Sequence, residues 1–419
     1  MSTYFVCELM GDDANAGTSA DAPFATVQAA IDVKAADETI LFRPYLLAYN
    51  KPHPCALPAG GWYSVRFVDA QLGTDAGGIQ GLSPSSGAWA TLQGGIDYGA
   101  IGQWCFCTGT ETLTTTISPD GLATYVTGWQ VFEGYSSTPR DGGYYNINGA
   151  AVAYGMQYPE ADFGDGYLFA NLNIYGQSAH AVLFGAGAAR GALLWNVKAD
   201  AAYNRYGFYS TSSSNSVVTL FCKATTARYG FNSLSANKWV AIGCVADACA
   251  LQGFRAAGPM TILRSLAIES GTGFYCASAG SAVDSVAYNC TDGFDAVGLG
   301  VFLGCISISN SGNGFGFSAG ARPILLNTDA YGNTSANYHA SIWPPAGSRA
   351  VDPQLVNPAS DDFRVKPTSP LFNGGVAGLH HLPDLAPVGH IVGPYTSRIV
   401  HIAASRQLGL LADRMAARG

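Results

Sequence analysis

The chain has 419 residues, and only 12% of them are charged, against roughly 25% in ordinary soluble domains. It carries 52 glycines and a net charge of −8, while 48% of its residues are hydrophobic. A chain this apolar can form a large core, which argues against wholesale disorder. The acidic balance argues against nucleic-acid binding, which needs clustered lysine and arginine. Abundant glycine and scarce charge indicate a β-rich protein with many tight turns.

The N-terminal residues MSTYFVCELMGDD lack the basic start and long apolar run of a signal peptide, and no stretch of 18 apolar residues follows. We therefore expect no membrane-spanning helix and synthesis in reducing cytoplasm, with the ten cysteines mostly free thiols. The alternative is a mature secreted protein whose signal peptide has been removed.

A duplicated unit opens the chain. Residues 17–32 (GTSADAPFATVQAAID) resemble residues 81–97 (GLSPSSGAWATLQGGID). The matching pairs, all 65 residues apart, are Phe24 and Trp89, Val27 and Leu92, Gln28 and Gln93, Ile31 and Ile96, and Asp32 and Asp97. Their apolar members lie on one face of a short helix. Each copy predicts a strand, a loop, a short helix and a strand, which gives a first unit over 1–63 and a second capping unit over 64–103.

Residues 104–166 are predicted to form the first, irregular turns of the next region. Trp129, Val131 and Phe132 fit a core strand, and the segment PEADFGDG at 159–166 fits a protruding acidic loop.

A second repeat runs from about residue 167 to 340 with a period of 20 to 26 residues. One recurring position is small and polar: Asn171, Asn196, Cys222, Cys244, Ser265, Ser285, Cys305 and Asn327. Another is a phenylalanine preceded by glycine: Phe208, Phe231, Phe254, Phe274, Phe294 and Phe315. The spacing lacks the Leu-x-x-Leu-x-Leu rhythm of leucine-rich repeats, and a β-sandwich would not keep one residue type in register over six units.

This pattern predicts an all-β, single-stranded parallel β-helix over residues 104–350, because each turn of about 22 residues must bury its inner face against its neighbours. Turns stack about 4.8 Å apart, so equivalent residues form ladders. We expect the phenylalanines to form an internal stack and the small polar residues to line a bend.

The end of the chain differs in character. Residues 351–393 are predicted to be a closing turn followed by an extended segment, in which His380 and His381 read as a linker pair. Residues 394–419 form a basic amphipathic tail, predicted either to cap the far end of the coil or to dock onto a partner. Its apolar and basic residues are Ile399, Ile402, Leu408, Leu411 and Met415, with Arg398, Arg406, Arg414 and Arg418.

Three segments together with the Gly-Phe turns resemble the right-handed β-helix proteins of the pectate-lyase-like superfamily, over most of residues 1–375. They are GDDANAGTSADAPFATVQAAID near the start, GWQVFEGYSSTPRDGG at the first turns and DPQLVNPASDDFRVKPTSPLFNGG at 352–375. The superfamily includes polysaccharide lyases, glycoside hydrolases, epimerases, surface proteins and phage tailspikes, so the resemblance specifies the fold but not the activity.

Lyase-like members usually begin with one capping unit, whereas this chain begins with two. With this extra unit and without a secretion signal, the chain resembles a phage virion protein more than a secreted enzyme. That resemblance implies a virion location with action at the cell exterior, a homotrimer, and other virion proteins and bacterial surface polysaccharide as partners.

A pair of Arg-Tyr steps precedes two of the Gly-Phe steps. Arg205-Tyr206 and Arg228-Tyr229 lie 23 residues apart, which is one turn, and Arg255 follows in the next turn. Aromatic faces stack on sugar rings and guanidinium groups bind carboxylates or sulfates, so these five residues are candidates for binding an acidic glycan. The alternatives are a tyrosine pair with solvated arginines, or a contact between subunits.

Candidate catalytic carboxylates lie further along. Asp292 falls in the same column as the tyrosines, Asp295 follows across the Gly-Phe step, and Glu269 belongs to the preceding turn. Glycosidases need two carboxylates about 5 to 9.5 Å apart, which neighbouring turns can supply. Aspartates are also common in turns for backbone reasons.

Lys198, Lys223 and Arg255 are candidates for a lyase base or for charge neutralisation. Lys223 occupies a position where other turns carry Val, Leu or Ile, and the alternatives for it are a side chain that snorkels to solvent or one that forms an ion pair. Asp247 is a similar oddity among apolar residues.

No cofactor is predicted, although calcium remains possible at the acidic loop through Glu160, Asp162 and Asp165. Cys105 and Cys107 are two apart on a predicted strand, which is not a zinc or redox spacing.

The leading hypothesis is a phage spike, fibre or decoration subunit that binds host-surface glycan, with or without depolymerase activity. The alternatives are a free polysaccharide lyase or glycoside hydrolase, and an inert structural spacer.

Overall fold

A computed structural model describes residues 2–371 apart from short gaps. The gaps are residues 9, 35–37, 44–46, 49–50, 53–61, 73–87, 99–102, 118–129, 142, 152, 159–166, 177–178, 186–191, 202–204, 212–215, 235–237, 279, 318–321, 343–346 and 359–361. Trp129, the acidic loop with Glu160, Asp162 and Asp165, the pair His380 and His381, and the tail at 394–419 lie outside the described residues.

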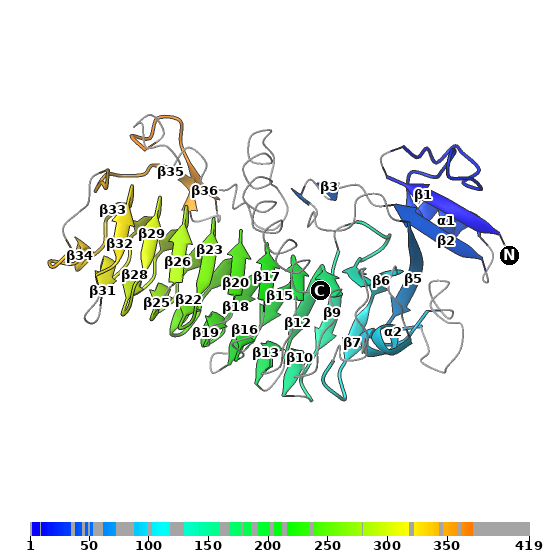
Figure 1. Cartoon of the computed structure of the whole chain (residues 1–419), viewed down its shortest axis with the longest axis horizontal. Coiled ribbons are helices and arrows are strands. Elements are labelled where there is room, and N and C mark those ends of the chain that lie inside the picture. The colour runs from blue at the N-terminus through cyan, green and yellow to red at the C-terminus, as the bar shows by residue number, and fades with distance from the viewer. Residues whose placement is uncertain are drawn as a thin grey trace, which may run out of the picture.

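The chain forms a parallel β-helix in which each turn contributes a strand to each of three sheets (Figure 1). Sheet 1 contains β1 (Thr3–Cys7), β2 (Thr39–Arg43), β5 (Tyr63–Asp69), β6 (Gln103–Thr108), β8 (Gln130–Gly134), β11 (Tyr167–Ala170), β14 (Ala192–Trp195), β17 (Ser216–Leu220), β20 (Lys238–Ile242), β23 (Met260–Leu263), β26 (Gly280–Val283), β29 (Val301–Leu303) and β32 (Ile324–Leu326). Its neighbours pair in parallel, except for β2 and β5.

Sheets 2 and 3 complete the coil. Sheet 2 contains β7 (Thr110–Thr112), β9 (Tyr145–Asn148), β12 (Leu172–Tyr175), β15 (Lys198–Asp200), β18 (Lys223–Thr225), β21 (Val245–Asp247), β24 (Leu266–Ile268), β27 (Val286–Tyr288), β30 (Ile306–Ile308) and β33 (Asp329–Tyr331). Sheet 3 contains β10 (Tyr154–Tyr158), β13 (His180–Phe184), β16 (Tyr206–Ser210), β19 (Tyr229–Ser233), β22 (Gln252–Ala256), β25 (Thr272–Cys276), β28 (Asp292–Ala296), β31 (Asn313–Phe317) and β34 (Ala336–Tyr338). The prediction of an all-β parallel β-helix is confirmed.

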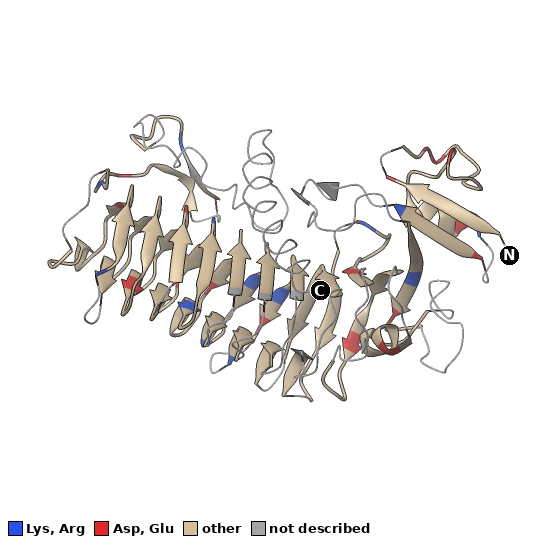
Figure 2. Ribbon diagram, in the orientation of Figure 1, with Lys and Arg blue, Asp and Glu red and all other residues tan. Residues whose placement is uncertain are grey.

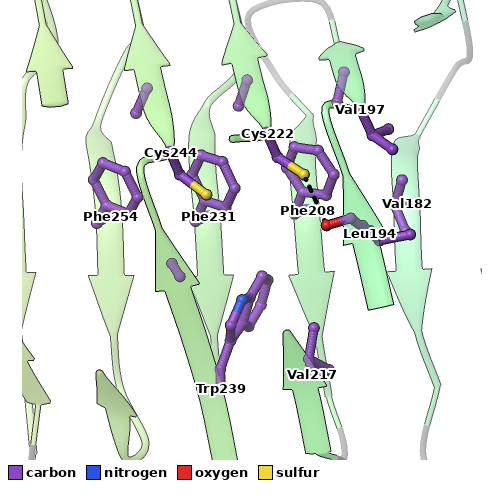
Figure 3. Packing of buried hydrophobic residues seen from close by; sticks show 14 of the residues in the cluster. Val182, Leu194, Val197, Phe208, Val217, Cys222, Phe231, Trp239, Cys244 and Phe254 are labelled. Atoms are coloured by element: carbon purple, nitrogen blue, oxygen red, sulfur yellow. Dashed lines mark hydrogen bonds between the residues drawn. The ribbon is translucent and has the colours of Figure 1, made fainter. Parts of the chain in front are cut away.

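The predicted phenylalanine stack fills the coil on the inner side of sheet 3. From Phe208 to Phe315, successive ring centroids lie 4.6–4.9 Å apart and the ring planes differ by at most 11°. Figure 3 shows three of these rings beside the thiols of Cys222 and Cys244. The glycine before each ring is required by close packing: a Cβ on Gly230 would lie 2.6 Å from the Gly253 carbonyl oxygen.

The small polar residues occupy two columns, and the single column expected from the sequence was wrong. Asn171, Asn196 and Asn327 sit at the bend between sheets 1 and 2 with φ of 52–55°. The serines and cysteines lie one residue beyond the bend and are buried; Cys222 and Cys244 are two of them. Other turns place Phe, Gly, Arg or Asp at the positive-φ position, so residue type alone did not mark it.

The duplicated N-terminal units have the same structure. In the first, Phe24 bridges to Val6 of β1 ahead of helix α1 (Val27–Val33). In the second, Trp89 bridges to Val68 of β5 ahead of helix α2 (Leu92–Tyr98). Helix α2 covers the first turn of the coil, because Trp89, Leu92 and Ile96 share a buried cluster with Phe132 and Ile147.

A buried ion cluster joins the first unit to the coil. The Arg140 guanidinium donates to Glu8 (Nε–Oε1 2.8 Å) and to Glu133 (Nη1–Oε2 2.9 Å), and Glu133 has no exposed surface. The Trp104 indole N–H donates to the same Glu133 oxygen at 2.8 Å. Arg140 and Glu133 come from the segment WQVFEGYSSTPRDGG, Trp104 from β6, and Glu8 directly follows β1, so the cluster fixes the first unit against the opening turns.

After β34 the chain folds back along the outer face of sheet 2. The hairpin of β35 (Leu355–Asn357) and β36 (Asp362–Val365) lies beside the coil in Figure 1. The buried apolar residues of this contact are Leu266, Ile268, Val286, Ile306, Ile308, Leu355, Phe363 and Leu371. Sheet 2 therefore changes from polar to apolar on its outer face where the returning segment covers it. A second two-stranded hairpin, β3 (Leu47–Ala48) and β4 (Lys51–Pro52), precedes β5.

Nine cysteines within the described residues are free and buried. Cys105 and Cys107 both face the interior from β6, as expected from their spacing. In the same part of the chain, no helix has the length and hydropathy to cross a bilayer.

We predict that Arg140→Met lowers the free energy of unfolding by about 3–5 kcal/mol, because it leaves the buried Glu133 carboxylate without its counter-charge. Adding Glu133→Gln should restore part of the loss, since a glutamine oxygen can still accept from Trp104. Urea unfolding measures this, with the exposed Arg322→Met as control. Equal midpoints for Arg140→Met and Arg322→Met would show that the cluster contributes nothing.

The Asp329 carboxyl predicts a pH dependence of stability. Burial raises its pKa to about 6, against opposing effects of the Val351 N–H and Arg349, and its Oδ2 has no hydrogen-bond partner. The folded state therefore holds this proton more tightly than the unfolded chain, and stability is lost as the pH rises from about 4 through 6. Asp329→Asn should stabilise the protein by up to about 3 kcal/mol at pH 7.5 and by much less at pH 4.

Urea midpoints at the two pH values, with the exposed Asp21→Asn as control, measure this difference. A gain for Asp329→Asn that is the same at both pH values would contradict the titration.

Candidate functional site

The outer face of sheet 3 carries two columns of side chains. Side chains alternate along a strand, so the inward phenylalanine of each turn is followed by an outward residue. Strand register gives the first column as Tyr154, His180, Tyr206, Tyr229, Gln252, Thr272 and Asp292. The second column runs Leu183, Tyr209, Asn232, Arg255, Tyr275 and Asp295.

Aromatic rings form a continuous patch over four turns of these columns. Tyr206 stacks on Tyr229 in the next turn (centroids 5.1 Å apart) and on Tyr209 of its own strand (4.4 Å). His180 packs against Tyr206 at 4.6 Å and Tyr209 at 4.9 Å, and Tyr154 follows at 5.4 Å from His180. We call Tyr154, His180, Tyr206, Tyr209 and Tyr229 the aromatic face.

Arginines border the aromatic face where the chain enters sheet 3. The Arg228 N–H donates to the Arg205 carbonyl at 2.6 Å, so these two residues are neighbours in successive turns. The guanidinium carbons of Arg228 and Arg255 lie 5.4 and 5.1 Å from the centroid of the Tyr229 ring. The structure thus brings together the five residues that the sequence proposed for glycan binding. Charged residues are sparse along the rest of the coil (Figure 2).

Several buried polar atoms on this face have no hydrogen-bond partner: His180 Nδ1, Asn232 Nδ2 and Oδ1, and Gln252 Oε1. Burial, with a smaller effect of the Arg205 charge, lowers the His180 pKa to about 4, although the Ala179 backbone, which accepts a hydrogen bond from the imidazole, acts in the opposite direction. The imidazole is therefore neutral at physiological pH. Buried polar groups in folded proteins are normally paired, so this cluster is the arrangement expected of a site that pairs with a ligand.

The predicted catalytic carboxylates do not all share this face. Asp292 and Asp295 lie on β28, three residues apart, which separates their α-carbons by about 10 Å. Asp292 Oδ1 accepts the Asn313 N–H at 2.8 Å. Glu269 lies in the bend between sheets 2 and 3 with φ of 49°, where it accepts a hydrogen bond from Asn289 at 3.4 Å. These contacts give Asp292 and Glu269 structural roles; a catalytic role stays a prediction.

Lys198 and Lys223 lie on another wall, the outer face of sheet 2, away from Arg255. Lys223 Nζ pairs with Asp247 at 2.9 Å, which accounts for both odd residues of that region. Lys198 Nζ lies 4.1 Å from the Tyr144 ring centroid, and burial together with Lys223 lowers its pKa. No group of three metal-ligating side chains occurs among the residues that the structure describes.

Sequence reasoning missed five residues of this face: Tyr154, His180, Tyr209, Asn232 and Gln252. His180 precedes Ala-Val instead of Gly-Phe, so the motif did not reveal its place in the column. Tyr209 and Asn232 could have been found, because each directly follows the phenylalanine of its turn.

No family model matches the chain, and no curated protein matches it. Among solved structures, pectate lyase Pel9A is 14% identical over 77% of this chain and 95% of its own, with a TM-score of 0.47. GH136 lacto-N-biosidase from Eubacterium ramulus is 10% identical over 84% of this chain and 67% of its own (TM-score 0.28). A rhamnogalacturonan lyase is 13% identical over 80% and 69% (TM-score 0.21). At these identities and TM-scores the likeness carries no argument about activity, and the parallel β-helix rests on the strand pairing itself.

Proposed function

We propose that the aromatic face binds a glycan. The observation that carries this proposal is the coincidence of stacked rings with the unpaired buried polar groups of His180, Asn232 and Gln252. Sugar rings present C–H faces that pack on aromatic rings, while their hydroxyls pair with polar side chains placed at the ring edges.

The arginines favour an acidic glycan. Arg205 and Arg228 directly precede strands β16 and β19, and Arg255 lies within the next strand, β22, so all three are beside the tyrosines in neighbouring turns. A guanidinium group binds a carboxylate or sulfate through two parallel hydrogen bonds, which adds orientation to charge attraction. Sugar stacking and anion binding would therefore act within the same four turns.

We further propose that the chain is a phage virion protein, a spike, fibre or decoration subunit, which presents this face to bacterial surface polysaccharide. The doubled capping unit supports this proposal, since the coil already has a cap in α2 and the first unit forms an additional module held by Arg140. A homotrimer and contacts with other virion proteins belong to the same proposal.

A second candidate is a polysaccharide lyase or glycoside hydrolase. It is favoured by Asp292, which continues the first column two turns beyond Gln252, and by Asp295 in the second column. The third candidate, an inert spacer, gives no reason for unpaired polar groups to gather on one wall.

We predict that Tyr206→Ala and Arg228→Ala each weaken glycan binding about tenfold, because each removes part of the stacking or anion contact. Affinity electrophoresis through gels containing acidic or neutral bacterial surface polysaccharide measures this. The control is Tyr331→Ala, a tyrosine 40% exposed on sheet 2. Retardation that is the same for all three variants would rule out the aromatic face. New reducing ends that disappear with Asp292→Asn would establish the second candidate.

The virion assignment predicts that mass spectrometry of purified phage particles detects this chain in stoichiometric amount. Its presence in the infected-cell lysate but not in washed particles would overturn the assignment without affecting the glycan proposal.

A further inference from the structure

Asn232 is the least expected residue of the outer wall. It lies between Tyr209 and Arg255 in the second column, yet none of its surface is exposed. Both its amide nitrogen and its amide oxygen are without a hydrogen-bond partner. An apolar side chain such as leucine, which has the same branched skeleton, would occupy such a dry position without leaving polar groups unpaired, so an amide here needs another reason.

Arg255 is the neighbour of Asn232 in the next turn. Its α-carbon is next to that of Asn232, while its guanidinium reaches back toward the ring of Tyr229, three residues before Asn232 on the neighbouring strand. The arginine side chain therefore crosses the space bounded by Asn232, Tyr229 and Gln252. This placement agrees with Tyr229 being only 9% exposed and with the buried, unpaired Oε1 of Gln252.

The Arg255 guanidinium group is held in this position by weak contacts. In the described part of the chain, neither Arg228 nor Arg255 forms an ion pair, and both guanidinium groups share the one Tyr229 ring. A cation over an aromatic ring at a surface gains about 0.5–1 kcal/mol, whereas a bidentate bond to an anion is stronger. An anionic ligand can therefore draw Arg255 off the ring.

We propose that Arg255 is a displaceable cover and that Asn232 determines specificity for a sugar residue that carries an anionic group beside two adjacent hydroxyls. The anionic group pairs with the arginine that it displaces. The uncovered amide then donates from Nδ2 to one hydroxyl and accepts at Oδ1 from the other, which satisfies both atoms at once. The proposal rests on glycan binding at the aromatic face, and it identifies Asn232 as the residue that recognises the sugar hydroxyls.

The test uses the full chain and isothermal titration with four polymers. Carboxymethyl-dextran and dextran sulfate carry anionic groups on a sugar backbone, dextran is the neutral form of that backbone, and polyglutamate carries carboxylates without hydroxyl pairs. The variants are Asn232→Leu, Arg255→Ala and Tyr206→Ala, with Tyr331→Ala as control, and thermal unfolding is measured for each.

Asn232→Leu should weaken binding of the better anionic dextran about tenfold while leaving polyglutamate binding unchanged. Its Tm should equal or exceed that of the parent chain, because two unpaired buried groups are removed. Arg255→Ala should reduce the preference for the anionic dextran over dextran about tenfold without weakening dextran binding. The carboxymethyl and sulfate polymers show which anionic group the cover prefers.

Two failures are distinguishable. If the parent chain binds no sugar polymer better than Tyr206→Ala does, the glycan-binding proposal itself fails. If Tyr206→Ala weakens binding but Asn232→Leu leaves it unchanged, the aromatic face binds glycan and the role of Asn232 is overturned. A lowered Tm for Asn232→Leu together with unchanged binding would assign the amide to stability alone.

Discussion

Parallel strands must stay in register from one turn to the next, and the rest of this structure follows from that constraint. Each turn repeats the same bends, at which residues such as Asn196, Asp284 and Asn289 take φ near 50°. Because the bends recur at fixed places, the side chains between them fall into ladders that face either the interior or the outside. A ring in one turn then packs on the ring of the next, as Phe254 does on Phe274.

The same register acts on both sides of sheet 3. Inward, it produces parallel phenylalanine rings that fill the coil; outward, it aligns tyrosines and arginines that are 23 residues apart in the chain. Close stacking of neighbouring turns favours glycine ahead of the phenylalanine rings, as at Gly230 and Gly273. The outer wall is thus a regular array, and the residues that depart from its pattern are the candidates for ligand binding or catalysis.

The fold could be predicted from the sequence because the repeat consists of residue types that occupy sterically restricted positions. A Cβ at the glycines before these rings would meet a backbone carbonyl of the next turn, so the Gly-Phe steps predicted the internal phenylalanine stack correctly. The bend position has no such demand: Phe221, Arg264 and Gly304 all adopt it, and the small polar residues were therefore assigned to one column instead of two.

The sequence repeat could not predict contacts between segments that are far apart in the chain. The pairing of Arg140 with Glu8 joins residues 132 positions apart, and no periodicity points to it. Likewise, Arg228 was proposed from its motif, whereas the hidden amide of Asn232 became visible only when burial and hydrogen bonding were known.

The returning segment gives the coil a property that stacked turns lack on their own. A solenoid couples each repeat only to its neighbours, so its last turns can fray one at a time. Here Leu355 and Phe363 belong to one buried cluster with Leu266, Val286 and Ile306, which come from three successive turns. The returning segment therefore couples these three turns to one another, so that they unfold together and not one at a time.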